Sequence, residues 1–300
     1  MGEAQIVQRN NQPGEGSGAG ESGVSGESGR LETIIRPEKG WLAIDFAELW
    51  RYRELLFFLI WRDIKVRYKQ TVLGAAWAII QPVFSMIVFS IIFGSFAKIP
   101  SDNVPYPIFV YAGLLPWLFF SGSVSQAGMS LVSQANLLTK IYFPRLYVPA
   151  ASVGTALVDF CLSACVYVCL MLWFMHTPGW PVLLAPVLLL LTIITALGVG
   201  NILASLSVTY RDFRYVIPFM LQVWMYGSPV VYSATMIPAA YRPLMAINPM
   251  YGIIAAFRSA LLNLPVDWMA LGISSVVALG LFVFGLYLFR RTERQFADIA

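Results

Sequence analysis

The sequence predicts an all-α polytopic membrane protein with six transmembrane helices, from its composition, its long uncharged stretches and the distribution of its basic residues. Hydrophobic residues make up 58% of the 300 residues. Charged residues make up only 12%, against about 25% in a typical soluble domain. A compact soluble particle of this size has too little interior to bury so much apolar surface, so the surplus must face lipid.

Six stretches are uncharged or nearly so and reach the roughly 20 residues that a transmembrane helix needs. They are residues 72–97, 107–127, 150–175, 182–207, 215–234 and 268–289. A seventh candidate, 243–265, is interrupted by two prolines and an arginine. With six spans and a cytosolic N-terminus, the only basic residues outside the cytosol are Lys98, Arg242 and Arg258, in keeping with the positive-inside rule. We therefore expect residues 235–265 to form short re-entrant helices before the last span.

The N-terminal region precedes the predicted transmembrane domain, which covers residues 71–290. Residues 1–35 are rich in Gly, Ser and Glu and are predicted to be a disordered cytosolic tail, because they cannot bury enough apolar surface to offset chain entropy. Residues 40–70 are predicted to form an amphipathic helix in the plane of the lipid headgroups. One face of this helix carries Trp50, Phe57, Trp61, Ile64 and Tyr68. Residues 291–300 are predicted to be a cytosolic C-terminus.

Asp159 is the only formally charged residue inside the six predicted spans. Placing a carboxylate near the middle of a bilayer costs about 2.5–3.5 kcal/mol on insertion scales, so such residues face a cavity or a partner. Two interpretations remain open from the sequence. Asp159 contacts a transport pathway or another subunit, or it makes a polar contact with Ser, Thr or backbone on a neighbouring helix.

Aromatic residues are abundant, with 9 Trp, 14 Tyr and 20 Phe. Belts at the membrane interface or ordinary packing account for most of them. A pathway for sugars would also use them, because rigid aromatic rings suit the apolar C–H faces of sugar rings. The candidates for channel lining or substrate contact, besides Asp159, are Trp77, Phe84, Phe89, Phe93, Tyr111, Trp224 and Tyr226.

Several functional classes have no support in the sequence. No phosphate-binding loop of the Gly-x-x-x-x-Gly-Lys-Ser/Thr type occurs. The three cysteines lie on one helix face and are typical of packing residues. The single histidine, His176, lies in a predicted outer loop. We expect no metal, no cofactor, no catalytic residue and no nucleic-acid partner, and the chain has no internal repeat.

Four ordered blocks carry a resemblance that covers residues 40–300. They are Trp61–Thr71 with Leu73, Gly74, Trp77 and Pro82; Asn136–Pro149; Asn201–Pro218; and Ser228–Val230 with Tyr232, Pro238, Asn248–Met250 and Phe257–Arg258, after which Phe296–Ile299 also fits. In these blocks the chain resembles the permease subunits of type-2 ABC exporters for cell-surface polysaccharides. The closest likeness is to O-antigen, capsule and teichoic-acid export permeases.

The resemblance implies export of an undecaprenyl-linked polysaccharide across the bacterial cytoplasmic membrane. It implies a homodimer that works with two copies of a separate ABC ATPase, so that nucleotide chemistry belongs to the partner. It also implies that two segments contact the ATPase. Their residues are Arg62, Asp63, Lys65, Arg67 and Tyr68 in the first segment, and Asn136, Lys140, Pro144 and Arg145 in the second.

Other functions were weighed against this one. A drug or lipid exporter of the same superfamily is the nearest alternative, and the aromatic density favours polysaccharide. A membrane enzyme such as a glycosyltransferase or an intramembrane protease would need converging catalytic groups, whereas Asp159 stands alone in the spans. A proton-coupled transporter would need repeats and buried titratable groups.

Overall fold

The computed structural model describes residues 50–69, 74, 76–135 and 143–293, together with two short strands. The strands β1 (Ala4–Gln5) and β2 (Ile34–Ile35) pair antiparallel, with Ala4 opposite Ile35. They belong to a separate unit, Met1–Asp45, and lie in the stretch predicted to be a disordered tail. The rest of that tail lies outside the described residues. The second unit, Phe46–Ala300, contains all of the described helices.

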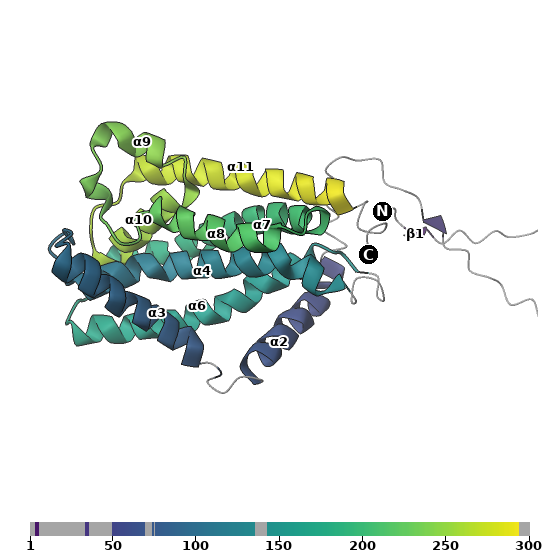
Figure 1. Cartoon of the computed structure of the whole chain (residues 1–300), viewed down its shortest axis with the longest axis horizontal. Coiled ribbons are helices and arrows are strands. Elements are labelled where there is room, and N and C mark those ends of the chain that lie inside the picture. Colours follow the sequence, from purple (N-terminus) through teal and green to yellow (C-terminus); the bar gives the residue numbers. More distant parts are fainter. Residues whose placement is uncertain are drawn as a thin grey trace, which may run out of the picture. The chain divides into compact units, whose positions relative to one another are not determined.

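The second unit is an all-α bundle, as predicted (Figure 1). Its elements in chain order are α2 (Arg53–Lys69), α3 (Ala76–Phe89), the π-helical turn η1 (Ser90–Phe96), α4 (Tyr106–Ser133), α6 (Tyr147–Trp173), the 3-10 turn η2 (Trp180–Leu184), α7 (Ala185–Thr209), α8 (Phe213–Tyr226), the 3-10 turns η3 (Ala234–Met236) and η4 (Ala239–Tyr241), α9 (Arg242–Met245), α10 (Pro249–Leu262) and α11 (Trp268–Glu293). The predicted short helices before the last span are present as α9 and α10.

Five helical segments in the described part of the chain are long and apolar enough to cross a membrane: Ala76–Phe96, Tyr106–Ser133, Tyr147–Trp173, Trp180–Thr209 and Trp268–Glu293. They correspond to five of the six predicted spans. The remaining predicted span, 215–234, is helical only as far as Tyr226. The helix ends there because Gly227 and Ser228 are followed by Pro229, and a proline disfavours helical geometry in the residue before it.

Helix α4 is the central element of the bundle. It packs against α3, α6, α7, α8 and α10, and residues Ile108 to Ala112 have no exposed surface. The C-terminal ends of α4, α7 and α11 lie together with the N-terminal ends of α6 and α8 (Figure 1). We call this the basic end, because Arg145, Arg211, Arg214, Arg290 and Arg291 lie at these helix ends. The opposite end, with the α3–α4 and α6–α7 connections and α9, is the far end (Figure 1).

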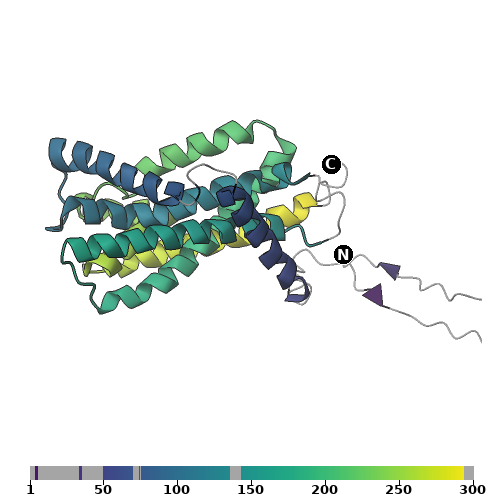
Figure 2. The same cartoon turned by 90° about the horizontal axis from the view of Figure 1, so that it is seen from below.

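Helix α2 crosses the bundle obliquely and packs against α6 (Figure 2). A Cβ on Gly154 of α6 would lie 2.5 Å from Cδ1 of Ile60, so the two helices meet closely there. The buried cluster beneath α2 consists of Leu59, Leu131, Phe143, Tyr147, Val148, Ala151, Ala204 and Phe289.

Of the predicted aromatic face, Tyr68 contacts α6 through Asp159, whereas its three most N-terminal members are exposed. Trp50 and Phe57 are each 70% exposed, and Trp61 is 49% exposed. The sequence analysis identified this face but not the second apolar stripe around Leu59, with which α2 packs against the bundle. Residues 40–49 of the predicted helix lie outside the described residues.

Helices α7 and α11 approach each other at two glycines. A Cβ added to Gly285 would lie 2.3 Å from the carbonyl oxygen of Gly198, which is backbone and cannot rotate away. Gly280, on the same helix, has nothing within 4 Å of its added Cβ. The pair therefore offers a matched test of whether the α7–α11 crossing determines stability.

We expect Gly285→Ala to lower the thermal unfolding midpoint in detergent, because overpacking at a rigid contact costs about 1–3 kcal/mol. Gly280→Ala should leave the midpoint unchanged or raise it slightly, since alanine favours helix by about 1 kcal/mol. Equal midpoints for the two variants would contradict a close backbone contact between these helices.

Candidate functional site

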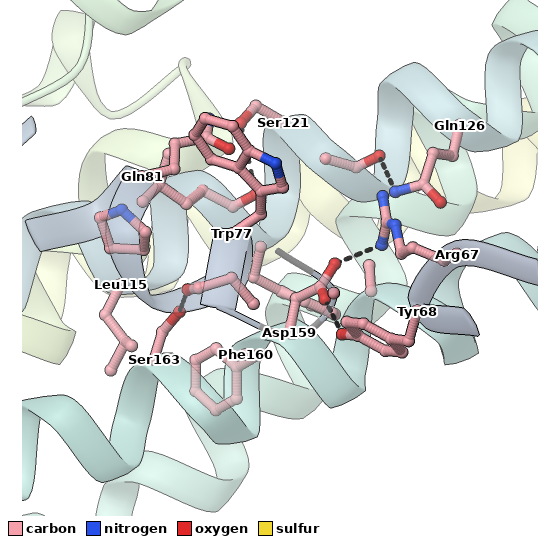
Figure 3. A pocket seen from close by; sticks show the side chains of 17 residues that line it. Arg67, Tyr68, Trp77, Gln81, Leu115, Ser121, Gln126, Asp159, Phe160 and Ser163 are labelled. Carbon is pink, nitrogen blue, oxygen red and sulfur yellow. Dashed lines mark hydrogen bonds and ion pairs between the residues drawn. The ribbon is translucent and has the colours of Figure 1, made fainter. Parts of the chain in front are cut away.

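A cavity of about 270 Å³ lies between the C-terminal end of α2, the start of α3, and the middle of α4 and α6 (Figure 3). It is lined by Arg67, Tyr68, Gly74, Trp77, Ala78, Gln81, Pro82, Leu115, Leu118, Phe119, Ser121, Gly122, Gln126, Ala156, Asp159, Phe160 and Ser163. Four separate helices contribute, so the cavity exists only in the folded bundle. Its lining combines apolar rings with amide, hydroxyl, carboxylate and guanidinium groups.

Asp159, in the middle of α6, receives its partners from α2. Its Oδ2 forms an ion pair with Arg67, and its Oδ1 accepts a hydrogen bond from the Tyr68 hydroxyl (Figure 3). The side chains of Arg67 and Asp159 are 36% and 31% exposed. The carboxylate is thus compensated within the chain, by a charged and an aromatic residue rather than by the Ser, Thr or backbone partner considered from the sequence. It also lines the cavity, and its contact with a transport pathway stays a prediction.

Tyr68 acts as a neutral donor in this cluster. Burial raises the pKa of its hydroxyl first of all, and the hydrogen bond to Asp159 raises it further, because ionisation would place two negative charges together. The hydroxyl therefore keeps its proton at any physiological pH. Together, Arg67 and Tyr68 fasten the C-terminal end of α2 to the centre of α6.

The other walls offer an aromatic platform beside two amides. Trp77 on α3 is 54% exposed, and Gln81 is one helical turn away on the same helix. Across the cavity, Nε2 of Gln126 donates to the carbonyl of Gly122 at 3.1 Å (Figure 3). The Ser163 hydroxyl donates to the carbonyl of Ala78 at 3.3 Å and holds α3 to α6. This set of groups can stack on an apolar ring face and hydrogen-bond hydroxyl groups.

The residues predicted to contact an ATPase lie in three different parts of the structure: the cavity, the surface of α2 and the basic end. Arg67 and Tyr68 line the cavity, whereas Arg62 pairs with its neighbour Asp63 at 2.7 Å, and Nζ of Lys65 lies 5.2 Å from the Trp61 ring centre. Pro144 and Arg145 are half-buried at the basic end, and Arg145 donates to the carbonyl of Glu293 at 2.9 Å. Asn136 and Lys140 lie outside the described residues.

Of the residues predicted to line a channel, the cavity contains Trp77 and Asp159. Tyr111 is fully buried, stacks on Tyr167 at 6.0 Å and donates to the carbonyl of Ser163. Trp224 donates its indole N–H to Oδ1 of Asn248 at 2.7 Å. The others lie away from the cavity: Phe84 and Tyr226 are exposed, and the rings of Phe89 and Phe93 pack edge to face.

Gln81, Ser121 and Gln126 are cavity residues that the sequence analysis missed. Amides and hydroxyls carry no formal charge, so these residues do not stand out inside an apolar span as Asp159 does. Glutamine inside the predicted spans occurs at Gln81 and Gln126, and also at Gln222, which does not line the cavity. Among the described residues, no group of three His, Cys, Asp or Glu side chains could hold a metal ion.

Comparison with known proteins gives consistent matches over most of the chain. The profile of a family described as ABC-2 type transporter matches residues 54–262. An O-antigen export system permease protein, RfbA, of Myxococcus xanthus is 34% identical over 215 residues, which cover 71% of this chain and 82% of the relative. The RfbA protein of Klebsiella pneumoniae is 26% identical over 250 residues, 82% of this chain and 95% of the relative. The polysialic acid transport protein KpsM of Escherichia coli is 25% identical over 240 residues, 78% of this chain and 92% of the relative.

The ion pair between α2 and α6 gives a prediction about docking. Asp159→Asn should increase hydrogen exchange of the α2 amides, by an amount equivalent to at most about 1 kcal/mol, because the pair is partly exposed. Asp63→Asn is the matched control: Asp63 also pairs with an arginine, but the arginine is its neighbour on α2, so exchange should not change.

A double-mutant cycle with Arg67→Gln separates the pair from the effects of single substitutions. Equal exchange of the α2 amides in the wild type and in Asp159→Asn would contradict a tethering role for the cluster.

Proposed function

Since this chain belongs to the family of ABC-2 type transporters, we propose that it is the membrane permease of an ATP-driven exporter for a lipid-linked cell-surface polysaccharide of the O-antigen type. The observation that carries the proposal is the cavity between α2 and the bundle, whose Trp77, Asp159 and glutamines suit a sugar. The names of the RfbA and KpsM relatives support the same substrate class.

The basic end faces the cytosol in this proposal, and the far end faces outward. Charge supports the orientation, because arginines are concentrated at the helix ends of the basic end and the positive-inside rule places such residues in the cytosol. Both chain termini are then cytosolic, and the membrane is the bacterial cytoplasmic membrane. Lipid would cover the exposed apolar surfaces of the bundle.

ATP hydrolysis is assigned to a separate ABC ATPase, two copies of which would serve a homodimer of this chain. The described chain offers the partner a charged surface on α2, where Lys65 is exposed and Arg62 and Asp63 are half-buried. Because α2 is fastened through Arg67 to Asp159, a push on α2 would move one wall of the cavity. The proposed coupling surface and the proposed substrate site are thus joined by one ion pair.

Within the cavity, each group has a proposed part in receiving an undecaprenyl-linked glycan. The ring of Trp77 would stack on the C–H face of a sugar. Gln81, Gln126 and the remaining lone pairs of Asp159 would bind its hydroxyl groups. The lipid anchor would stay in the bilayer beside α2, so that sugars enter the cavity while the chain of isoprene units remains in lipid.

A drug or small-lipid exporter of the same family is the second candidate. The polar lining of the cavity favours the sugar, because an apolar drug would leave Asp159, Gln81 and Gln126 without partners on binding. A membrane enzyme is disfavoured by the geometry among the described residues. The carboxylate in the cavity is held by Arg67 and Tyr68, and no Ser–His or second-carboxylate arrangement accompanies it.

The partner prediction concerns charge on α2. Lys65→Glu should weaken co-purification with the cognate ATPase, because it reverses an exposed charge on the proposed contact surface. Lys98→Glu reverses a lysine that is also exposed, at the far end, and should leave the complex intact. An unchanged complex with Lys65→Glu, or equal loss with both variants, would contradict a contact through this face of α2.

The substrate prediction concerns Trp77. Trp77→Ala should lower export of the polysaccharide about fivefold or more at an unchanged protein level, because one aromatic stacking platform contributes about 1–3 kcal/mol when it stacks on a nucleic-acid base. Trp180→Ala removes a tryptophan that is 76% exposed at the far end and should export normally. A fall in protein level that accounts for the lost export would instead indicate a packing role for Trp77.

A further inference from the structure

A non-helical strap, residues Pro229–Tyr232, follows α8 towards the far end, and its backbone has an unusual set of partners. The carbonyls of all four residues accept hydrogen bonds from side chains. Arg258 donates to Pro229 at 2.8 Å, to Val230 at 2.7 Å and to Tyr232 at 2.9 Å. The Tyr106 hydroxyl donates to Val231 at 2.7 Å. Two side chains thus satisfy four consecutive carbonyls.

Arg258 lies on α10 and is only 3% exposed. Its Nε also donates to the carbonyl of Phe109 at 3.3 Å, and the guanidinium lies 3.9 Å from the centre of the Phe109 ring. No carboxylate in the described part of the chain lies within ion-pair distance of it. Carbonyl dipoles and an aromatic face compensate the buried charge at short range, and the carboxylate of Asp102 contributes from beyond ion-pair distance. Asp159, by contrast, has its counter-charge in direct contact.

These hydrogen bonds supply donors to backbone carbonyls that have no helical partner in an apolar environment. Carbonyls that lack helical partners must be satisfied by protein groups where water is absent. A guanidinium has five N–H groups in a planar fork and can serve several carbonyls at once, whereas a lysine presents three donors from one atom. One arginine can therefore replace several of the hydrogen bonds that a continuous helix would have made.

Gly113 on α4 provides the space for this fork. A Cβ on Gly113 would lie 2.4 Å from Nη2 of Arg258 and 2.7 Å from the carbonyl oxygen of Val230. Beyond the strap, Asp102 accepts hydrogen bonds from Ser233 at 2.6 Å and Thr235 at 3.1 Å. The strap is thus held on one side by α10 and α4 and is continued by a segment anchored to the α3–α4 connection.

We propose that Arg258 is the positioning residue that keeps the strap closed over the far end of α4 and α10, and that loss of its contacts releases the strap as a unit and admits water there. Three of the four strap carbonyls depend on this one side chain, so they are lost together when it moves. The proposal rests on the proposed function only in assigning the far end to the outer, exit side.

The test measures access to Val230, which has no exposed surface. The native cysteines Cys161, Cys165 and Cys169 are first replaced by serine, and a single cysteine is introduced by Val230→Cys. A membrane-impermeant maleimide is then added to spheroplasts, in which it reaches only the outer face of the cytoplasmic membrane. Leu244→Cys, on α9 at the far end and 64% exposed, serves as the control for reagent access in every background.

Three substitutions at Arg258 and Gly113 are compared in the single-cysteine proteins. Arg258→Met removes every donor and keeps the length of the side chain, and Arg258→Lys keeps the charge without the fork. Gly113→Ala keeps Arg258 in the sequence but crowds both its guanidinium and the carbonyl of Val230. We expect labelling of the cysteine at position 230 to be about tenfold or more faster with Arg258→Met and with Gly113→Ala, and intermediate with Arg258→Lys, as for a local opening.

Labelling of position 230 that stays within about twofold of the parent in folded Arg258→Met protein would overturn the proposal. Labelling with Arg258→Lys as slow as in the parent would also overturn it, because charge alone would then suffice. If Arg258→Met does not accumulate in the membrane, the labelling rates with Gly113→Ala and Arg258→Lys test the proposal instead. The labelling rate is measured without a glycan, so it tests the role of Arg258 independently of the proposed function. Faster labelling would support that role even if the protein exported no polysaccharide, and the lack of export would contradict only the exporter proposal.

Discussion

Polar groups in an apolar environment need partners within the protein, and the rest of this structure depends on that constraint. Asp159 satisfies it through Arg67 and Tyr68 of α2, and Arg258 satisfies it through carbonyls of the strap and of α4. The hydroxyls of Thr192 and Thr195 satisfy it by donating to carbonyls one turn earlier in α7. The threonine bonds stay within one helix, whereas the Asp159 and Arg258 clusters determine which elements lie side by side: α2 against α6, and the strap against α4 and α10.

The two charged clusters hold different elements to the bundle, with α4 between them: the Asp159 cluster holds α2, and Arg258 holds the strap. The middle of α4 carries Gly122 and Gln126 at the cavity, and its N-terminal half carries Phe109 and Gly113 at the strap. The cavity cluster is about one-third exposed and open to competition from water and ligand, whereas Arg258 is enclosed. A partly solvated ion pair exchanges partners at little cost, so α2 is suited to repeated movement while the strap moves only when its contacts are broken together.

Hydropathy identified most of the fold and fell short where local chemistry interrupts a regular pattern. Composition and length predicted the membrane class and five of the long helices, because apolar length alone decides those. The stretch 215–234 satisfied the same criterion, yet Pro229 and the arginine 29 residues later turn its second half into a strap. The aromatic stripe of α2 was visible from its period, but the stripe that packs against the bundle was not, since both stripes are apolar.

The sequence by itself determined that the protein is a membrane bundle, that its basic residues gather at one end, and that Asp159 needs a partner, because each of these follows from transfer free energies of individual residues. Only the tertiary structure decided that the partner is Arg67, 92 residues away. The same holds for the meeting of Trp77, Gln81 and Gln126 at one cavity and for the pairing of Arg258 with the strap. Hydropathy is a property of a segment and contains no information about helix rotation or distant pairing, and these contacts depend on both.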